Sequence, residues 1–197
     1  MLFHPKASTT DGFTLIELMV TLAVAAILVA MAAPSFRTLL ASNRLSTQTN
    51  ELVGAITFTR SEAVKRGRNV TLCRTDSATA LACLAGNQSA WEHWIVIDPG
   101  IAATDSSRVL RRGSIPTQQI SVAASSNLTA TANQIVFRPD GMALGSDGST
   151  LLIATLRVCT EAQGVDQNAR LLELRGGGRV ATTTASEICT DPVSNPT

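Results

Sequence analysis

A single carboxylate lies within a long apolar stretch near the start of this 197-residue sequence. The stretch runs from Phe13 to Phe36, and Glu17 is the one charged side chain among its 24 residues. About 20 apolar residues are enough for a helix to cross the hydrocarbon core of a bilayer. A carboxylate at the centre of such a helix costs ~2.5–3.5 kcal/mol on the mildest scale, and less near an end. The sequence therefore predicts that Glu17 acquires a compensating partner.

A cleavage site is predicted directly before this stretch. A secretory signal peptide is cut after its apolar region, but here the small residue Gly12 precedes the apolar region. Cleavage after Gly12 would keep the apolar helix and create a new amino terminus at Phe13, about one helical turn from Glu17. The alternative is an uncleaved membrane anchor in which Glu17 is incidental.

The segment from Gly12 to Glu17 resembles the leader junction of type IV pilins and type II secretion pseudopilins. In that family a prepilin peptidase cleaves after the Gly and methylates the new N-terminal Phe. The family's Glu compensates the terminal amine of a neighbouring subunit during assembly. The resemblance implies these roles for Gly12, Phe13 and Glu17. It also matches Pro34 to a proline that kinks or locally melts the family's long helix.

Composition argues against catalysis and against bulk binding of nucleic acid. The net charge is +1, which implies no general attraction to nucleic acid or to anionic lipid. Aromatic residues make up 4% and Tyr is absent, which argues against a base-stacking surface. Of the two histidines, His4 lies in the predicted leader and His93 in a predicted strand. The sequence contains no Walker loop, Rossmann fingerprint or metal-ligand cluster. We therefore expect no enzyme activity, no cofactor and no metal.

Four cysteines form an even set without the C-x2-C spacing of a zinc site. Disulfides are the usual state of cysteines in an exported domain, and four cysteines allow three pairings. We favour the pairs Cys73–Cys83 and Cys159–Cys189, because each closes a local segment. Free buried thiols are the alternative.

The helical pattern continues beyond the apolar stretch. Leu45, Leu52, Ile56 and Ala63 recur at the spacing of one helix face. The opposite face is predicted to carry polar residues, namely Arg44, Gln48, Asn50 and Glu51. Gly67 follows two basic residues, Lys65 and Arg66, and this order is typical of a helix end. One helix is therefore expected from Phe13 to Arg66, apolar all round at first and amphipathic later.

Beyond Gly67 the alternation is that of strands, without a second sustained helix. The expected strands are 69–74, 91–98, 108–111, 119–122, 134–138, 151–159, 170–175 and 178–182, the last two forming a hairpin. A loop is expected over 76–89. The predicted class is α+β, a long N-terminal helix packed on an antiparallel sheet. The predicted organisation is a leader at 1–12, a membrane-spanning half-helix at 13–36, an amphipathic half-helix at 37–67 and a periplasmic β-rich domain at 68–197.

Later motifs resemble one subgroup, the minor pilins of GspH/FimT (FimU-like) type. The helix end Phe58–Gly67, the strand Val70–Cys73 and the Trp-rich segment Trp91–Val96 follow the subgroup's order, although His93 stands where Gly is usual. The resemblance implies a type IV pilin fold and a minor pilin at the tip of a type IV pilus, which helps to prime assembly and serves twitching or adhesion. A type II secretion minor pseudopilin is the alternative.

The resemblance also implies partners and a location. The expected partners are other minor and major pilins, an inner-membrane assembly platform and the prepilin peptidase. The chain is expected to span a bacterial inner membrane once, with a periplasmic C-terminal domain, and to be extracellular after assembly.

DNA binding is a further alternative. Some pilins of this subgroup resemble DNA receptors, with Gly-Arg-x-Arg near the C-terminus. Here the matching residues are Gly178–Ala181, so the second Arg is missing. Arg170, Arg175 and Arg179 remain candidates for phosphate contacts along one hairpin, but this role is not favoured.

Overall fold

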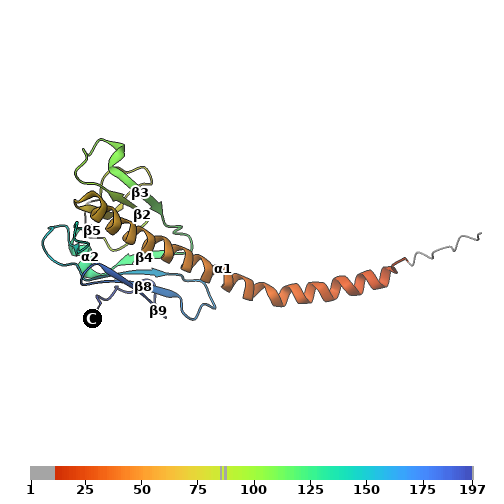
Figure 1. Ribbon diagram of the computed structural model, residues 1–197. Coiled ribbons are helices and arrows are strands. Elements are labelled where there is room, and N and C mark those ends of the chain that lie inside the picture. Colours follow the sequence, from red (N-terminus) through yellow and green to blue (C-terminus); the bar gives the residue numbers. More distant parts are fainter. Residues whose placement is uncertain (1–11, 85, 87, 197) are drawn as a thin grey trace, which may run out of the picture. The chain divides into compact units, whose positions relative to one another are not determined.

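The computed structural model describes residues 12–84, 86 and 88–196, except for the side chains of residues 32–34. The chain divides into two compact units, residues 1–39 and 40–197. Helix α1 (Leu15–Arg66) contributes to both units (Figure 1). It ends at Arg66 as predicted, and Gly67 follows with a left-handed φ of 64°. The kink predicted at Pro34 concerns how the two units are arranged and stays a prediction.

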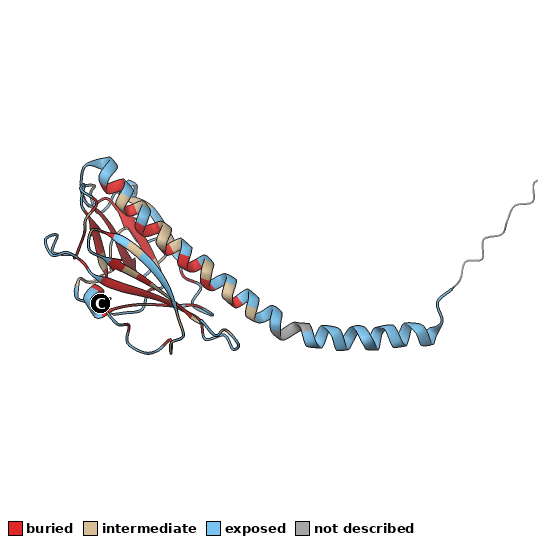
Figure 2. Ribbon diagram, turned by 60° about the horizontal axis from the view of Figure 1, so that its bottom comes forward, coloured by how far each residue is buried: buried red, intermediate tan, exposed pale blue. Residues whose placement is uncertain are grey.

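The first unit consists of the N-terminal part of α1. Its described side chains are exposed on every face up to Arg37, and Thr38 is half-buried (Figure 2). By length and composition alone, α1 is able to cross a membrane. A helix that is apolar all round requires lipid or other helices around it.

In the second unit α1 buries one face. The four residues predicted for that face, Leu45, Leu52, Ile56 and Ala63, are all buried. The predicted polar face is wrong at Gln48, which is 4% exposed. Its amide donates to the Glu51 carboxylate over 3.4 Å, and this bond offsets the cost of burying a polar group.

The rest of this unit is built from two antiparallel sheets. The first has five strands in the order β3-β2-β1-β5-β6, with bounds β1 Val70–Thr75, β2 His93–Ile97, β3 Val109–Ser114, β5 Gln134–Phe137 and β6 Ala143–Leu144. The second has four strands in the order β4-β7-β8-β9, with bounds β4 Ser121–Ala124, β7 Ala154–Cys159, β8 Ala169–Arg175 and β9 Arg179–Ala185. A 3-10 turn, η1 (Ser106–Arg108), and a short helix, α2 (Ser126–Ala130), connect strands.

The α+β class and the long helix are confirmed, but several strand predictions are corrected. There are two sheets where the sequence predicted one. Trp91 lies outside β2, because its backbone N–H donates to Val122 across the sheets (2.8 Å) and its indole to Asn133 (3.0 Å). The long strand begins at Ala154, because Leu151 and Leu152 pair instead with β6. Strand β6 and helix α2 were not predicted.

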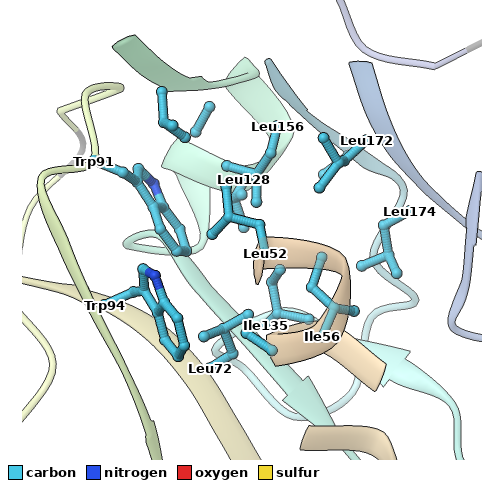
Figure 3. Close-up of a cluster of buried hydrophobic side chains, with 14 of the residues drawn as sticks. Leu52, Ile56, Leu72, Trp91, Trp94, Leu128, Ile135, Leu156, Leu172 and Leu174 are labelled. Atoms are coloured by element: carbon cyan, nitrogen blue, oxygen red, sulfur yellow. The ribbon is translucent and has the colours of Figure 1, made fainter. Parts of the chain in front are cut away.

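The hydrophobic core joins α1 to both sheets (Figure 3). Helix α1 contributes Leu52 and Ile56, which lie among side chains from each sheet. The other labelled members are Leu72, Trp91, Trp94, Leu128, Ile135, Leu156, Leu172 and Leu174. Burial of a side chain of this size typically contributes about 1.5–3 kcal/mol. The two sheets are therefore held together largely through the helix and the residues around it.

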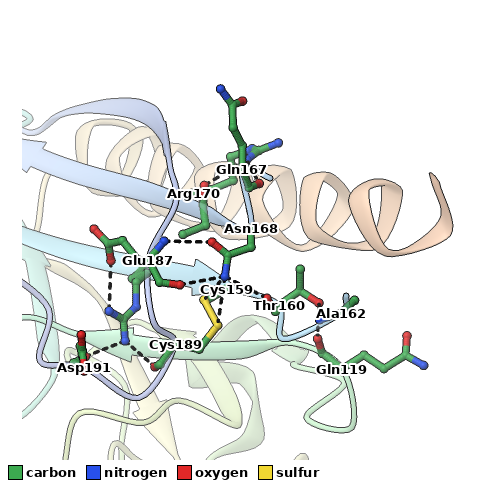
Figure 4. Close-up of a disulfide and its surroundings, with 12 residues drawn as sticks. Gln119, Cys159, Thr160, Ala162, Gln167, Asn168, Arg170, Glu187, Cys189 and Asp191 are labelled. Carbon is green, nitrogen blue, oxygen red and sulfur yellow. Dashed lines mark hydrogen bonds and ion pairs between the residues drawn. A yellow bond between two sulfur atoms is a disulfide. The ribbon is translucent and has the colours of Figure 1, made fainter. Parts of the chain in front are cut away.

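Both favoured disulfides are present. Cys73 bonds to Cys83 and Cys159 to Cys189, with Cα–Cα distances of 5.5 and 5.6 Å. The second disulfide ties the C-terminal tail, residues 186–196, to β7. Asn168 fixes the same tail, since it accepts a hydrogen bond from the Glu187 N–H (2.9 Å) and donates to the Glu187 carbonyl (2.8 Å) (Figure 4).

The tail also covers a buried arginine of β7, Arg157, whose side chain is 2% exposed. Its guanidinium binds the Glu187 carboxylate (3.1 Å) and donates to the carbonyls of Cys189 and Asp191, the latter over 2.7 Å. The tail is therefore part of the folded domain.

Candidate functional site

Thr14 caps the start of α1. The Glu17 N–H donates to Thr14 Oγ1 over 3.3 Å, and the Leu18 N–H donates to the Thr14 carbonyl over 3.2 Å. Thr14 and Glu17 have the Thr-x-x-Glu spacing of a capping box, in which the side chain of the first residue satisfies a free N–H of the first turn. The cap explains why the helix begins at Leu15 and not at Phe13. Sequence reasoning missed it, although the spacing alone would have revealed it.

The predicted processing site is open. Gly12 is exposed, and Phe13 is 83% exposed. A Cβ added to Gly12 would meet no atom within 4 Å among the described residues. The fold of this chain therefore does not itself require Gly at position 12, so any requirement for a small residue must come from an enzyme that binds the segment.

Glu17 is exposed on an apolar surface. Val20, which is three residues further on and lies on the same helix face, is 55% exposed. Within the described part of the chain, its carboxylate makes no hydrogen bond or ion pair. Gly12 and Phe13 therefore precede the helix, Glu17 lies in its first turn, and no partner for Glu17 is found among the described residues.

The other end of α1 is held by a buried carboxylate that sequence reasoning missed. Asp98, directly after β2, is fully buried, and its Oδ2 lies 3.1 Å from Arg66 Nη1 and 2.6 Å from Arg68 Nη2. Arg66 also binds Glu62 one turn earlier, at 2.6 Å. This hydrogen bond holds the pKa of the Glu62 carboxyl below its usual value, against the opposing effect of burial. The cluster fixes the C-terminal end of α1 to the five-stranded sheet.

The three candidate DNA-contacting arginines do not form one surface. Arg175 and Arg179 are directly opposite each other across the β8–β9 hairpin, and both are exposed. Arg170 is five residues from Arg175, so its side chain leaves the opposite face of β8. It donates to the carbonyls of Gln167 and Ala169. Arg175 binds Glu173 over 2.6 Å, which neutralises much of its charge.

Two family models match different parts of the chain. Residues 48–178 match the family model described as type II transport protein GspH. Residues 9–33 match the prokaryotic N-terminal methylation motif. No curated protein sequence matches the chain.

Two solved structures are similar to this chain, both of the type IV minor pilin FimU from Pseudomonas aeruginosa strain PAO1. For the crystal form in space group P65, identity is 15%, the TM-score is 0.48, and the match covers 77% of this chain and 96% of FimU. For the form in P21, identity is 15%, the TM-score is 0.49, and coverage is 79% and 94%.

Proposed function

The chain belongs to the GspH family, and from this premise we propose that it is a minor pilin that assembles into a type IV pilus, where it stands at the tip and helps to prime assembly. The family is one of type IV minor pilins and pseudopilins, which are structural proteins and not enzymes. Membership implies assembly with other pilins at membrane-based machinery. The tip position and the priming role are our proposal.

The observation that carries the proposal is the exposed Glu17 carboxylate, four residues after the exposed Phe13. A helix that is apolar all round leaves lipid most easily by entering a bundle of similar helices. In that bundle the Glu17 carboxylate would meet the free amine of a neighbour's first residue. Opposite charges attract more strongly in such a low-dielectric setting than in water. A mispaired subunit would leave two buried charges without partners, so Glu17 would also set the register of the subunit.

We propose that the free amine arises by cleavage after Gly12, followed by methylation of Phe13. Both residues are exposed and precede the helix cap at Thr14. The first part of α1 would then stay in the inner membrane as a single span, with the C-terminal domain in the periplasm. A prepilin peptidase and an inner-membrane assembly platform are the partners that this route requires.

A secretion role is the second candidate, because the matching family is described as a type II transport protein. The same helix and the same Glu17 would serve a short pseudopilus equally well. A twitching assay and a secretion assay on one deletion strain separate the two roles. Loss of twitching alone supports the pilus, and loss of secretion alone supports the pseudopilus.

The experiment on Glu17 uses the full chain in the deletion strain. Glu17→Ala should still insert in the membrane and be processed, but it should be absent from the sheared pilus fraction. The matched control is Thr21→Ala, one turn further on, where the hydroxyl only bonds the Leu18 carbonyl of its own helix (2.9 Å). This control should enter pili normally. A normal yield of Glu17→Ala in sheared pili would overturn the assembly role.

A further inference from the structure

Strand β9 has an edge that differs from the other three sheet edges. β3 carries two exposed arginines, Arg111 and Arg112, on its strand. β4 is covered by residues 89–91, which bridge at Ala90–Ala123 and bond to Val122 and Ala124. β6 is two residues long and is covered by Leu151 and Leu152. Charges, short length and covering segments are the devices that keep sheet edges from pairing with other chains.

β9 has none of these devices over most of its length. It is seven residues long, and Val180 to Ala185 is a run of uncharged Val, Ala and Thr. Within the described residues, β9 pairs with β8 alone. Ala181 and the three threonines that follow it are exposed. A long, uncharged and unpaired edge of this kind is a template for a further strand.

The strand is also held in place. Arg60 of α1 lies 3.5 Å from the Gly178 carbonyl that precedes β9, at the limit of a hydrogen bond. Gly178 packs so closely on the five-stranded sheet that an added Cβ would lie 2.8 Å from Phe137 Cε1 and 2.6 Å from the Gly141 carbonyl. Because β9 is fixed at this end, pairing with another strand requires little ordering of β9 itself, which lowers the cost of association.

We propose that the free edge of β9 binds β9 of a second copy of this chain, with the two strands antiparallel and centred on Thr182. In this register Arg179 faces Ala185, Val180 faces Thr184, Ala181 faces Thr183, and Thr182 faces itself. The two Arg179 side chains then lie at opposite ends, about 20 Å apart for six residues at ~3.4 Å each. No like charges are opposed, and the central cross-strand pair of Thr182 with Thr182 is favourable.

The resulting interface joins two four-stranded sheets along one edge and is small. Interfaces below ~1,200 Å² of total buried area are typically weak or transient. Confinement of both copies to one membrane by α1 would raise their effective concentration and so favour pairing. The test therefore uses the full chain in phospholipid vesicles, and traps the pair covalently.

Three variants are compared, each with one introduced cysteine in addition to the two native disulfides. After mild oxidation, disulfide-linked dimers are quantified on a non-reducing gel. Thr182→Cys places two thiols directly opposite, where Cβ atoms are ~4.5–5.5 Å apart. Arg179→Cys places them about 20 Å apart, and the exposed Thr104→Cys lies outside the hairpin. We expect at least ten times more dimer for Thr182→Cys than for either control. Equal yields from all three variants would overturn the proposal.

A mixed sample tests the register. Differently tagged Ala181→Cys and Thr183→Cys chains should cross-link to each other more than either does to itself, because these positions face one another only in the centred antiparallel pair. Unchanged Trp fluorescence verifies that the variants are folded. Absence of dimer in vesicles, with cross-linking of Thr182→Cys to a different protein in the native membrane, would assign the edge to another subunit and refute pairing with a second copy.

Discussion

Replacing Arg157 by methionine should destabilise the C-terminal domain by about 3 kcal/mol. The guanidinium donates to two backbone carbonyls of the tail and binds Glu187. An unsatisfied buried carbonyl costs ~1–3 kcal/mol. The Cys189 carbonyl carries most of this cost because it is buried, whereas Asp191 is exposed and its carbonyl regains water more easily. The lost ion pair adds little, since the Glu187 side chain is 33% exposed.

Replacing a buried ion pair by apolar groups is often neutral or stabilising, because the charges no longer need to be desolvated. Here the partners include backbone carbonyls, which no substitution removes. Methionine fills the volume of the arginine stem but leaves these carbonyls without a donor, so we expect a net loss.

The assay is denaturant unfolding of the full chain in detergent, followed by the fluorescence of Trp91 and Trp94, which are 1% and 0% exposed. The matched control is Arg138→Met. Arg138 pairs with Asp140 at 3.0 Å, but both side chains are about half exposed, so its removal should cost under ~1 kcal/mol. A loss for Arg157→Met no greater than that of the control would refute the reasoning.

Changes to the disulfides and to Glu62 test what stabilises the domain. Removing a disulfide should lower the free energy of unfolding by an amount that grows with the length of the closed loop. The expected loss is ~3.6 kcal/mol for Cys159→Ser/Cys189→Ser, with a separation of 30 residues, and ~2.7 kcal/mol for Cys73→Ser/Cys83→Ser, with a separation of 10. A larger loss for the second variant in the same unfolding assay would contradict the loop argument. Because the pKa of Glu62 is lowered in the folded state, its contribution is present above the unfolded-state pKa and is lost as the pH falls through the folded-state pKa. Thermal unfolding should therefore show Glu62→Gln destabilised at neutral pH and little affected at strongly acidic pH; an equal loss at both would argue against this role.

Features set by local sequence were predictable. The end of α1 at Arg66 and its buried face follow from the spacing of apolar residues and from Gly67. The turn of the β8–β9 hairpin follows from its glycines. The pairing Cys159–Cys189 was favoured because it closes a local segment, and the structure contains it.

Features set by long-range contacts were not predictable. Nothing near Asp98 in the sequence indicates that Arg66 and Arg68 will neutralise it in the interior. The same holds for Arg157, whose partners lie 30 to 34 residues away. The division into two sheets depends on which strands pair with each other by hydrogen bonds. The alternation of residues within a strand does not specify its pairing partner. At the N-terminus the sequence predicts Gly12, Phe13 and Glu17 as a site. The proposed partner of Glu17 is the amine of another subunit, and the structure of one chain does not contain it.

The buried Asp98 has a mechanical consequence. A pulling force on the N-terminal end of α1 would be transmitted along the helix. It would act in shear on the apolar contacts that α1 makes between Leu45 and Ala63. Arg66 and Arg68, which bind Asp98, lie at the C-terminal end of the helix. There the force would be transmitted from α1 to the segment that follows β2. In a fibre under tension, the domain would resist extraction of its helix by many parallel contacts that must yield together.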